Sequence, residues 1–200
     1  MALAVVSLLG GCALSEDVAT IKYAPTQAEA VAGAKPVGLT VVDGRTADRN
    51  RISAKINGFG TEMAAIRSDK DVPSVVKDAL TAEFEERGFH VEAHGLAVTV
   101  TINQFYNQYG AGLMSGTANG DVNLTVAVAD AGGASLFSQA YDGTVKNTIM
   151  MANGSNAAES LVGAMNDAVK KMFADPAFVA TITGKKAPVT AGASPASPTS

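Results

Sequence analysis

Three side chains with metal-ligating chemistry alternate along one short segment of the chain, His90, Glu92 and His94. In an extended strand they share one face, because side chains two residues apart point the same way. Four residues of strand separate the two imidazoles by ~13 Å, and one ion with bonds of ~2 Å to nitrogen cannot span that distance. His90 and Glu92 alone leave such an ion two ligands short. We therefore expect a solvated strand face, with no metal and no cofactor.

A run of alternating charges follows the first apolar stretch, at Asp43, Arg45, Asp48, Arg49 and Arg51. A guanidinium group binds carboxylates through two parallel hydrogen bonds, so Arg45 and Arg49 are candidates for contact with a partner. Loops of this composition more often form internal ion pairs that order a turn. Both interpretations stay open at the level of sequence.

Amide and aromatic side chains are mixed over residues 104–109, where a glycine-rich break predicted over residues 107–116 begins. Adaptable binding surfaces combine these residue types near loops, which makes four of them candidate partner-binding residues, namely Gln104, Phe105, Tyr106 and Tyr109. A tyrosine-rich strand end is equally typical of the closure of a sheet. The sequence favours neither interpretation.

The chain has few residues that could form a nucleophilic catalytic site. The chain has no G-x-S-x-G motif and only two histidines. The segment Gly58-Phe59-Gly60 begins like a dinucleotide-binding fingerprint, but Met63 stands where the third glycine belongs, and the segment is predicted to be a flexible loop. We expect no enzyme. A carboxylate pair acting on cell-wall material stays as a less favoured alternative, because such pairs assemble only in three dimensions.

Composition limits the partners further. The chain has 200 residues, 47% of them hydrophobic, and a formal net charge of -4. An acidic chain lacks the basic surface that nucleic acid requires, so no nucleic-acid partner is expected. With one cysteine there is no intramolecular disulfide and no cysteine-rich zinc site.

That cysteine, Cys12, follows the apolar run 2–9 and the pair Gly10-Gly11, a layout that looks like a bacterial lipobox. Residues 1–11 are too short to cross a bilayer, which takes ~20 apolar residues, and fit the apolar core of a signal peptide. The missing basic residues before this run point to a truncated start. The thiol of Cys12 would carry a lipid, and Ala13 after it favours sorting to the outer membrane by the rule for such proteins.

Periodicity predicts the elements behind this anchor. Strands are expected over 37–42, 62–68, 89–93, 96–103, 122–128 and 136–145. A helix capped by Asp71, with Pro73 in its first turn, carries an apolar stripe and ends at Gly88. A second helix starts near Asn156 and ends at Asp175-Pro176.

The resulting order is β-β-α-β-β-β-β-α. It predicts an α+β fold with a mainly antiparallel sheet and two helices packed on one face. Residues 12–35 are expected to form the lipidated N-terminus and a tether, residues 36–182 a single domain, and residues 183–200 a disordered Ala/Pro/Ser/Thr tail.

Three segments carry a resemblance to a known family: Val37 to Arg45, Glu86-Arg87-Gly88-Phe89, and the strand from Val98 to Tyr106. With the Cys12 motif, they make the chain similar to the YajG-like family of bacterial lipoproteins. The resemblance implies an envelope lipoprotein and supplies no catalytic residues.

The expected function is a non-enzymatic binding module in the cell envelope. It would be held at the outer membrane through lipidated Cys12 and would bind a protein partner through a sheet edge or the segment 105–114. The alternative is an accessory subunit of an envelope assembly or transport complex.

Overall fold

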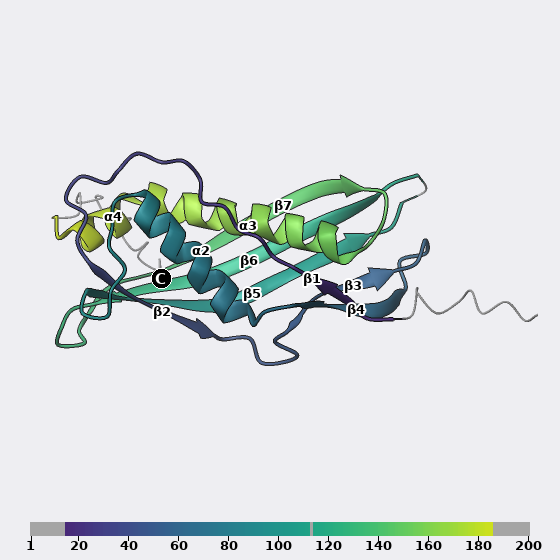
Figure 1. Cartoon of the computed structure of the whole chain (residues 1–200), viewed down its shortest axis with the longest axis horizontal. Coiled ribbons are helices and arrows are strands. Elements are labelled where there is room, and N and C mark those ends of the chain that lie inside the picture. Colours follow the sequence, from purple (N-terminus) through teal and green to yellow (C-terminus); the bar gives the residue numbers. More distant parts are fainter. Residues whose placement is uncertain (1–14, 113, 186–200) are drawn as a thin grey trace, which may run out of the picture.

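The computed structural model describes residues 15–112 and 114–185. The elements in chain order are β1 Asp17–Ala19, β2 Val37–Asp43, β3 Arg51–Ile56, β4 Glu62–Ser68, α2 Val72–Glu86, β5 Leu96–Gly110, β6 Gly116–Ala129, β7 Ser135–Ile149, α3 Gly154–Ala174 and α4 Pro176–Thr183. The predicted α+β class is confirmed. Helices α2 and α3 lie on the same face of a large sheet (Figure 1).

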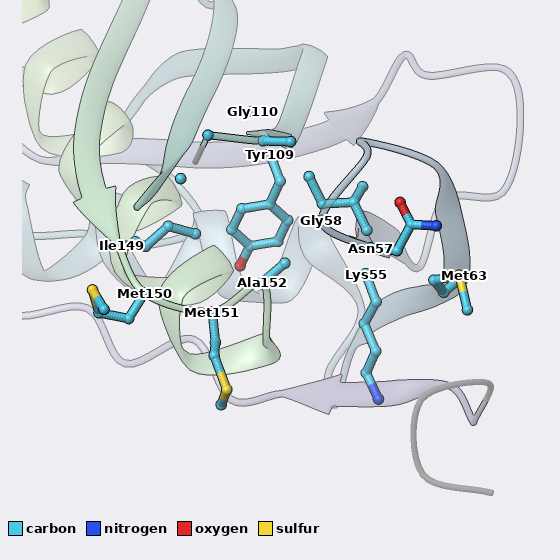
Figure 2. Close-up of a pocket in the computed structure, with 14 residues that line it drawn as sticks. Lys55, Asn57, Gly58, Met63, Tyr109, Gly110, Ile149, Met150, Met151 and Ala152 are labelled. Carbon is cyan, nitrogen blue, oxygen red and sulfur yellow. The ribbon is translucent and has the colours of Figure 1, made fainter. Parts of the chain in front are cut away.

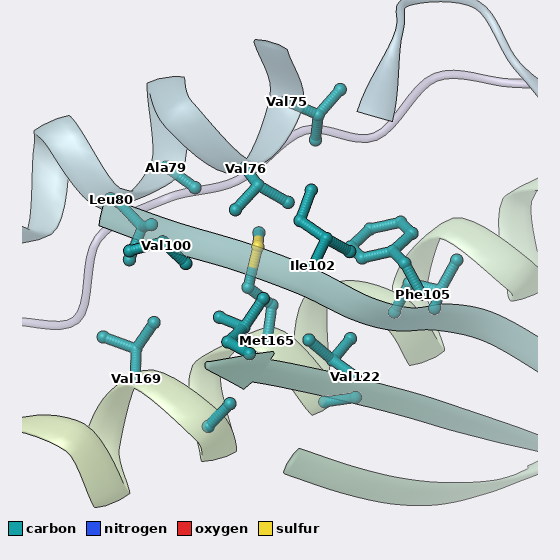
Figure 3. Packing of buried hydrophobic residues seen from close by; sticks show 14 of the residues in the cluster. Val75, Val76, Ala79, Leu80, Val100, Ile102, Phe105, Val122, Met165 and Val169 are labelled. Carbon is teal, nitrogen blue, oxygen red and sulfur yellow. The ribbon is translucent and has the colours of Figure 1, made fainter. Parts of the chain in front are cut away.

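The strands form two sheets. The larger has the order β2-β5-β6-β7, and the smaller has the order β1-β4-β3. The pairs β5–β6, β6–β7 and β3–β4 are antiparallel, whereas β2–β5 and β1–β4 are parallel. The smaller sheet lies at the end of β5 that leads into β6 (Figure 1). The larger sheet and the two helices enclose most of the apolar core, in which Met165 of α3 lies among residues of α2 and β5 (Figure 3).

Local sequence signals account for both long helices. The Asp71 side chain accepts a hydrogen bond from Ser74 N at 3.0 Å, which caps α2 as predicted. For α3 the cap is Asn153, whose side chain accepts from Asn156 N at 2.9 Å, so the helix begins two residues before the predicted start. Asp175 ends α3 and caps the short helix α4, which the sequence analysis did not predict.

A bulge in β5 reverses which side chains face the core. Residues 98, 100 and 102 are buried, and the pairing with β6 then shifts register between Ile102 and Gln104. Beyond this shift Phe105, Asn107 and Tyr109 are buried. An extra residue in one strand changes the face of every later side chain, because side chains alternate with a period of two.

Two glycines let α3 approach the sheet closely. A Cβ at Gly143 would lie 1.9 Å from the carbonyl oxygen of Ala164, and one at Gly120 would lie 2.3 Å from that of Ser160. Both distances are far below any real contact. The backbone of α3 therefore rests directly on β6 and β7 at these positions.

Several local predictions were wrong. Residues 89–93 do not form a strand, and only Val91 makes an isolated bridge, to Val37. The charged segment is a loop up to residue 50, as expected, but the strand β3 that follows it and pairs with β4 was not predicted. The expected break over 107–116 narrows to the five residues 111–115, since β5 extends to Gly110.

The segment before residue 36 is partly tied to the domain. Strand β1 pairs with β4, and further on Tyr23 Oη donates to Glu83 Oε1 at 2.6 Å. Glu83 also accepts from Thr26 N at 2.8 Å and pairs with Arg87 one turn along α2. These contacts hold residues within the region predicted as a tether against the body of the fold.

Candidate binding site

Three loops and the first described residues of the chain meet at one end of the molecule, which we call the loop end. The loops are 57–61 between β3 and β4, 111–115 between β5 and β6, and 150–153 between β7 and α3. In Figure 1 they gather at the right, where the chain enters β1. Strand pairing brings two of these loops together, because β5 and β7 end where β6 begins. The loop 57–61 of the smaller sheet lies against them, since a Cβ on Gly60 would be 3.7 Å from the Cβ of Ala111.

The loop end contains a cleft with a volume of about 350 Å³. Its lining is mainly apolar and includes three methionines. The lining residues are Lys55, Ile56, Asn57, Gly58, Met63, Tyr109, Gly110, Ala111, Gly112, Gly116, Ile149, Met150, Met151 and Ala152. Figure 2 shows the Tyr109 ring in the middle of the cleft, between Met150 and Met151 on one side and Gly58 and Asn57 on the other. Methionine side chains adapt to differently shaped apolar partners, so this lining suits a binding surface.

Tyr109 fixes the inner wall of the cleft. Its hydroxyl donates to the carbonyl oxygen of Asn153, the cap of α3, and thereby joins the end of β5 to the start of that helix. Burial of the ring raises the pKa of the Tyr109 hydroxyl above its usual range. This phenol therefore stays protonated at neutral pH and acts as a structural hydrogen-bond donor.

The N-terminal segment borders the cleft. Lys55, which lines it, donates from Nζ to the carbonyl oxygen of Ser15 at 2.9 Å. Two residues further on, Asp17 Oδ2 accepts from Gly154 N at 2.8 Å, at the start of α3. The first described residues are thus held beside the loop end.

Large apolar side chains project into solvent around the cleft. Phe59 is 96% exposed, Met114 91%, Met150 81% and Met151 67%. Single exposed apolar residues are ordinary, but several from three loops around one apolar cleft make this end of the molecule a candidate interaction surface.

The charged loop and the β5 bulge form a second, shallow pocket of about 310 Å³, lined by Arg45, Ala47, Asp48, Arg51, Asn103, Gln104, Phe105 and Tyr106. Here Arg45 pairs with Asp43 at 2.8 Å, and their side chains are only 10% and 5% exposed. Hydrogen bonds from the Arg45 guanidinium hold the pKa of the Asp43 carboxyl below its usual range. Arg49 Nε donates to the carbonyl oxygen of Arg45 at 3.0 Å. These contacts describe an ordered turn, in which Arg45 is already engaged.

The structure places the four candidates of β5 in two different environments. Phe105 is 1% exposed and Tyr109 7%, so both contribute to the core and close the sheet. Gln104 is exposed and Tyr106 is half-buried, beside Arg45. As a set they do not form one surface. Phe105 is not available to a partner, and Tyr109 reaches the candidate site only as its inner wall.

Sequence reasoning missed Lys55, Phe59, Met150 and Met151 as members of one site. A signal was present, because the segments 57–61, 111–115 and 150–153 each contain a large apolar residue and no Asp, Glu, Lys or Arg, and the first two also contain glycine. What the sequence could not show is that these three loops meet.

Within the described residues, no group of three or more His, Cys, Asp or Glu is placed to hold a metal ion. His90 and His94 lie in the irregular connection between α2 and β5. Among the described helices, none combines the length and the apolar character needed to cross a membrane. Cys12 lies outside the described residues.

Comparison with known proteins defines the class. The family model described as "Uncharacterized lipoprotein" matches residues 22–183. The chain belongs to this lipoprotein family, and membership implies anchoring to a membrane of the bacterial envelope. A comparison with curated proteins finds no relative by sequence.

Solved structures resemble the fold. A protein from Xanthomonas campestris matches with a TM-score of 0.51 at 16% identity, over 85% of this chain and 96% of that one. A lipoprotein from Neisseria meningitidis gives a TM-score of 0.38 at 11% identity, over 70% of this chain and 98% of that one. The likeness to the Xanthomonas campestris protein shows a shared fold alone. The likeness to the Neisseria meningitidis lipoprotein supports no conclusion about function.

Proposed function

We propose that this protein is a non-enzymatic binding lipoprotein that takes an apolar ligand in the loop-end cleft. Its anchor is a lipid on Cys12, and its place is the periplasmic face of the outer membrane, in keeping with the resemblance to YajG-like lipoproteins and with Ala13 after the cysteine. The observation that carries the proposal is the methionine-lined cleft, bordered by the segment that follows Cys12.

The chemistry of the cleft favours binding over catalysis. Its lining includes no Asp, Glu, His, Cys, Ser or Thr, the Tyr109 hydroxyl is held by Asn153, and the one amine in the lining, Lys55 Nζ, donates to the carbonyl oxygen of Ser15. General acid–base or nucleophilic catalysis needs a titratable or nucleophilic group within reach of the reacting atoms. Burial of apolar surface, at ~25 cal/mol per Å², is the interaction that this cleft offers.

The other binding surface predicted for the module is a sheet edge, and one edge of the larger sheet is strand β7. That edge is partly covered by α3. Thr144 N donates to Asp167 Oδ2 at 3.1 Å, and Lys171 Nζ donates to the carbonyl oxygen of Asp142 at 2.7 Å. Backbone groups engaged in this way are not free to pair with another chain, which favours the cleft as the binding site.

A dye-binding assay tests the cleft. We expect the neutral apolar dye N-phenylnaphthylamine to bind the full chain with increased fluorescence. Ala111→Trp, which places an indole in the cleft, should weaken this binding at least ~10-fold, equivalent to ~1.4 kcal/mol. Ala140→Trp, at an exposed position of β7, is the matched control and should bind as the parent does. Equal binding by both variants would reject the cleft as the site.

The anchor is tested separately. Mass spectrometry of the membrane-extracted protein should show a chain that begins at Cys12 and carries lipid. Cys12→Ser should move the protein to the soluble fraction and leave it unprocessed. Unchanged membrane association of this variant would reject anchoring through Cys12.

A further inference from the structure

The loops at the two ends of the molecule differ in charge. The three loops of the loop end contain no Asp, Glu, Lys or Arg, although Lys55 and Glu62 flank one of them. At the opposite end the β6–β7 turn contains Asp130, and the connection before β5 contains His90 and Glu92. Charge-free loops tipped with large apolar side chains suit contact with a medium that does not solvate charge well.

The loops that carry the exposed apolar side chains of the loop end lie next to one another. A Cβ on Gly60 would lie 3.7 Å from the Cβ of Ala111, so the loop that bears Phe59 contacts the loop that bears Met114. Met150 and Met151 line the same cleft as Gly58 and Ala111 (Figure 2). All four side chains are at least two-thirds exposed. The loops that carry these four side chains thus border one cleft, and we call the four side chains together the apolar rim.

The chain itself restricts how far this rim can be from the anchor. Ser15 is held by Lys55 at the cleft, and two residues separate it from Cys12. A fully extended chain covers at most ~3.6 Å per residue, so the Cα atoms of Cys12 and Ser15 lie within roughly 11 Å of each other. A lipid on Cys12 thus enters the bilayer next to the loop end and cannot enter it at the end occupied by Asp130.

We propose that the apolar rim is a membrane-contact surface: Phe59, Met114, Met150 and Met151 insert into the interface of the bilayer that holds the lipid of Cys12. The proposal rests on the anchor in the proposed function, and it deepens that function by turning the cleft toward the lipid. The apolar ligand of the cleft would then come from the membrane, as an acyl chain.

Contact of this kind has a physical purpose. Two or more acyl chains on the cysteine would already attach the protein stably, so the apolar rim is not required for attachment. Burial of the apolar rim instead fixes the orientation of the domain, because an anchor joined through two residues alone would leave it free to rotate.

Photo-crosslinking in the intact lipidated protein tests the contact. Benzoylphenylalanine replaces Phe59 in one variant and Leu136 in the other. Leu136 is a matched control, because it is 50% exposed and lies at the start of β7, at the opposite end of the molecule. The proteins are reconstituted in vesicles of phosphatidylethanolamine and phosphatidylglycerol, irradiated, and analysed by mass spectrometry. We expect lipid adducts at position 59 to exceed those at position 136 by about tenfold or more, as for a buried against a solvated group.

Two results would overturn the proposal. One is an equal yield of lipid adducts at both positions. The other is that position 59, irradiated in native envelopes, forms adducts with a protein and none with lipid, which would make the apolar rim a protein-binding surface. If mass spectrometry shows no lipid on Cys12, the anchor of the proposed function fails. The same probe in the Cys12→Ser chain, added to vesicles, then still reports whether the apolar rim contacts lipid.

Discussion

Lys55 Nζ donates a hydrogen bond to the carbonyl oxygen of Ser15 over 2.9 Å, which joins the wall of the loop-end cleft to the segment that follows Cys12. Lys55 belongs to β3 and Ser15 precedes β1, and both strands pair with β4. The position of Ser15 beside the cleft is therefore set by the smaller sheet. This relationship supports both the binding site and the membrane-facing orientation proposed for it.

The close contact between α3 and β7 predicts a severe effect of one methyl group. Gly143→Ala would bring a Cβ within 1.9 Å of the Ala164 carbonyl oxygen, so α3 must move away from the sheet. We expect a loss of about 3 kcal/mol or more in the free energy of unfolding, measured by urea denaturation. Gly58→Ala is the matched control, because its Cβ would meet no atom within 4 Å. A loss below that of the control would contradict the packing described.

The buried pair of Glu83 and Arg87 predicts a second large effect. The Glu83 side chain is fully buried, and the Arg87 guanidinium lies 4.1 Å from the centroid of the Phe173 ring. Glu83→Gln leaves Arg87 buried without its counter-charge, which costs about 3–5 kcal/mol of stability.

The control for that change is Asp78→Asn on the same helix, where the carboxylate is 73% exposed and 4.0 Å from Lys70. It should change the unfolding free energy by less than about 1 kcal/mol. Similar losses in the two variants would show that the Glu83 pair is not the stabilising element. Thermal and urea unfolding both provide the measurement.

Asp43 predicts a pH-dependent contribution to stability. Because Arg45 lowers the pKa of this carboxyl in the folded protein, its stabilisation is complete above the unfolded value of ~3.9 and is lost as pH falls through the lower folded value. At pH 7, Asp43→Asn should cost about 1–3 kcal/mol. The two unfolding curves should converge as the pH drops below ~4. A constant difference across this range would disprove the linkage.

The two tyrosines of the predicted binding segment should behave differently. Tyr109→Ala removes a buried ring and the bond to Asn153, and should lower the unfolding free energy by about 3–5 kcal/mol. Tyr106→Ala, at a half-buried position, should cost less than half of that. Differential scanning calorimetry would show the contrast. If both changes cost the same, the reversal of faces at the β5 bulge is wrong.

Much of the fold follows from local patterns in the sequence. The helix α2 was predicted with its cap at Asp71, its proline and its buried stripe, since these signals act within a few residues. The alternation of apolar and polar residues over 122–128 likewise predicted the C-terminal half of β6. Strand β3 was missed because its segment RISAKI lacks the strict alternation of a half-buried strand, since three consecutive residues, 52–54, are buried.

The candidate site shows where local reasoning stops. The sequence determined the class of protein through Cys12 and the α+β order, and it determined that three loops would be free of charge and tipped with apolar side chains. Only the tertiary structure decided which side chains reach the surface. One extra residue at Asn103 turned Phe105 and Tyr109 into the core. Strand pairing, which joins residues distant in the chain, gathered Phe59, Met114 and Met150 at one end, and no pattern within a single segment contains that information.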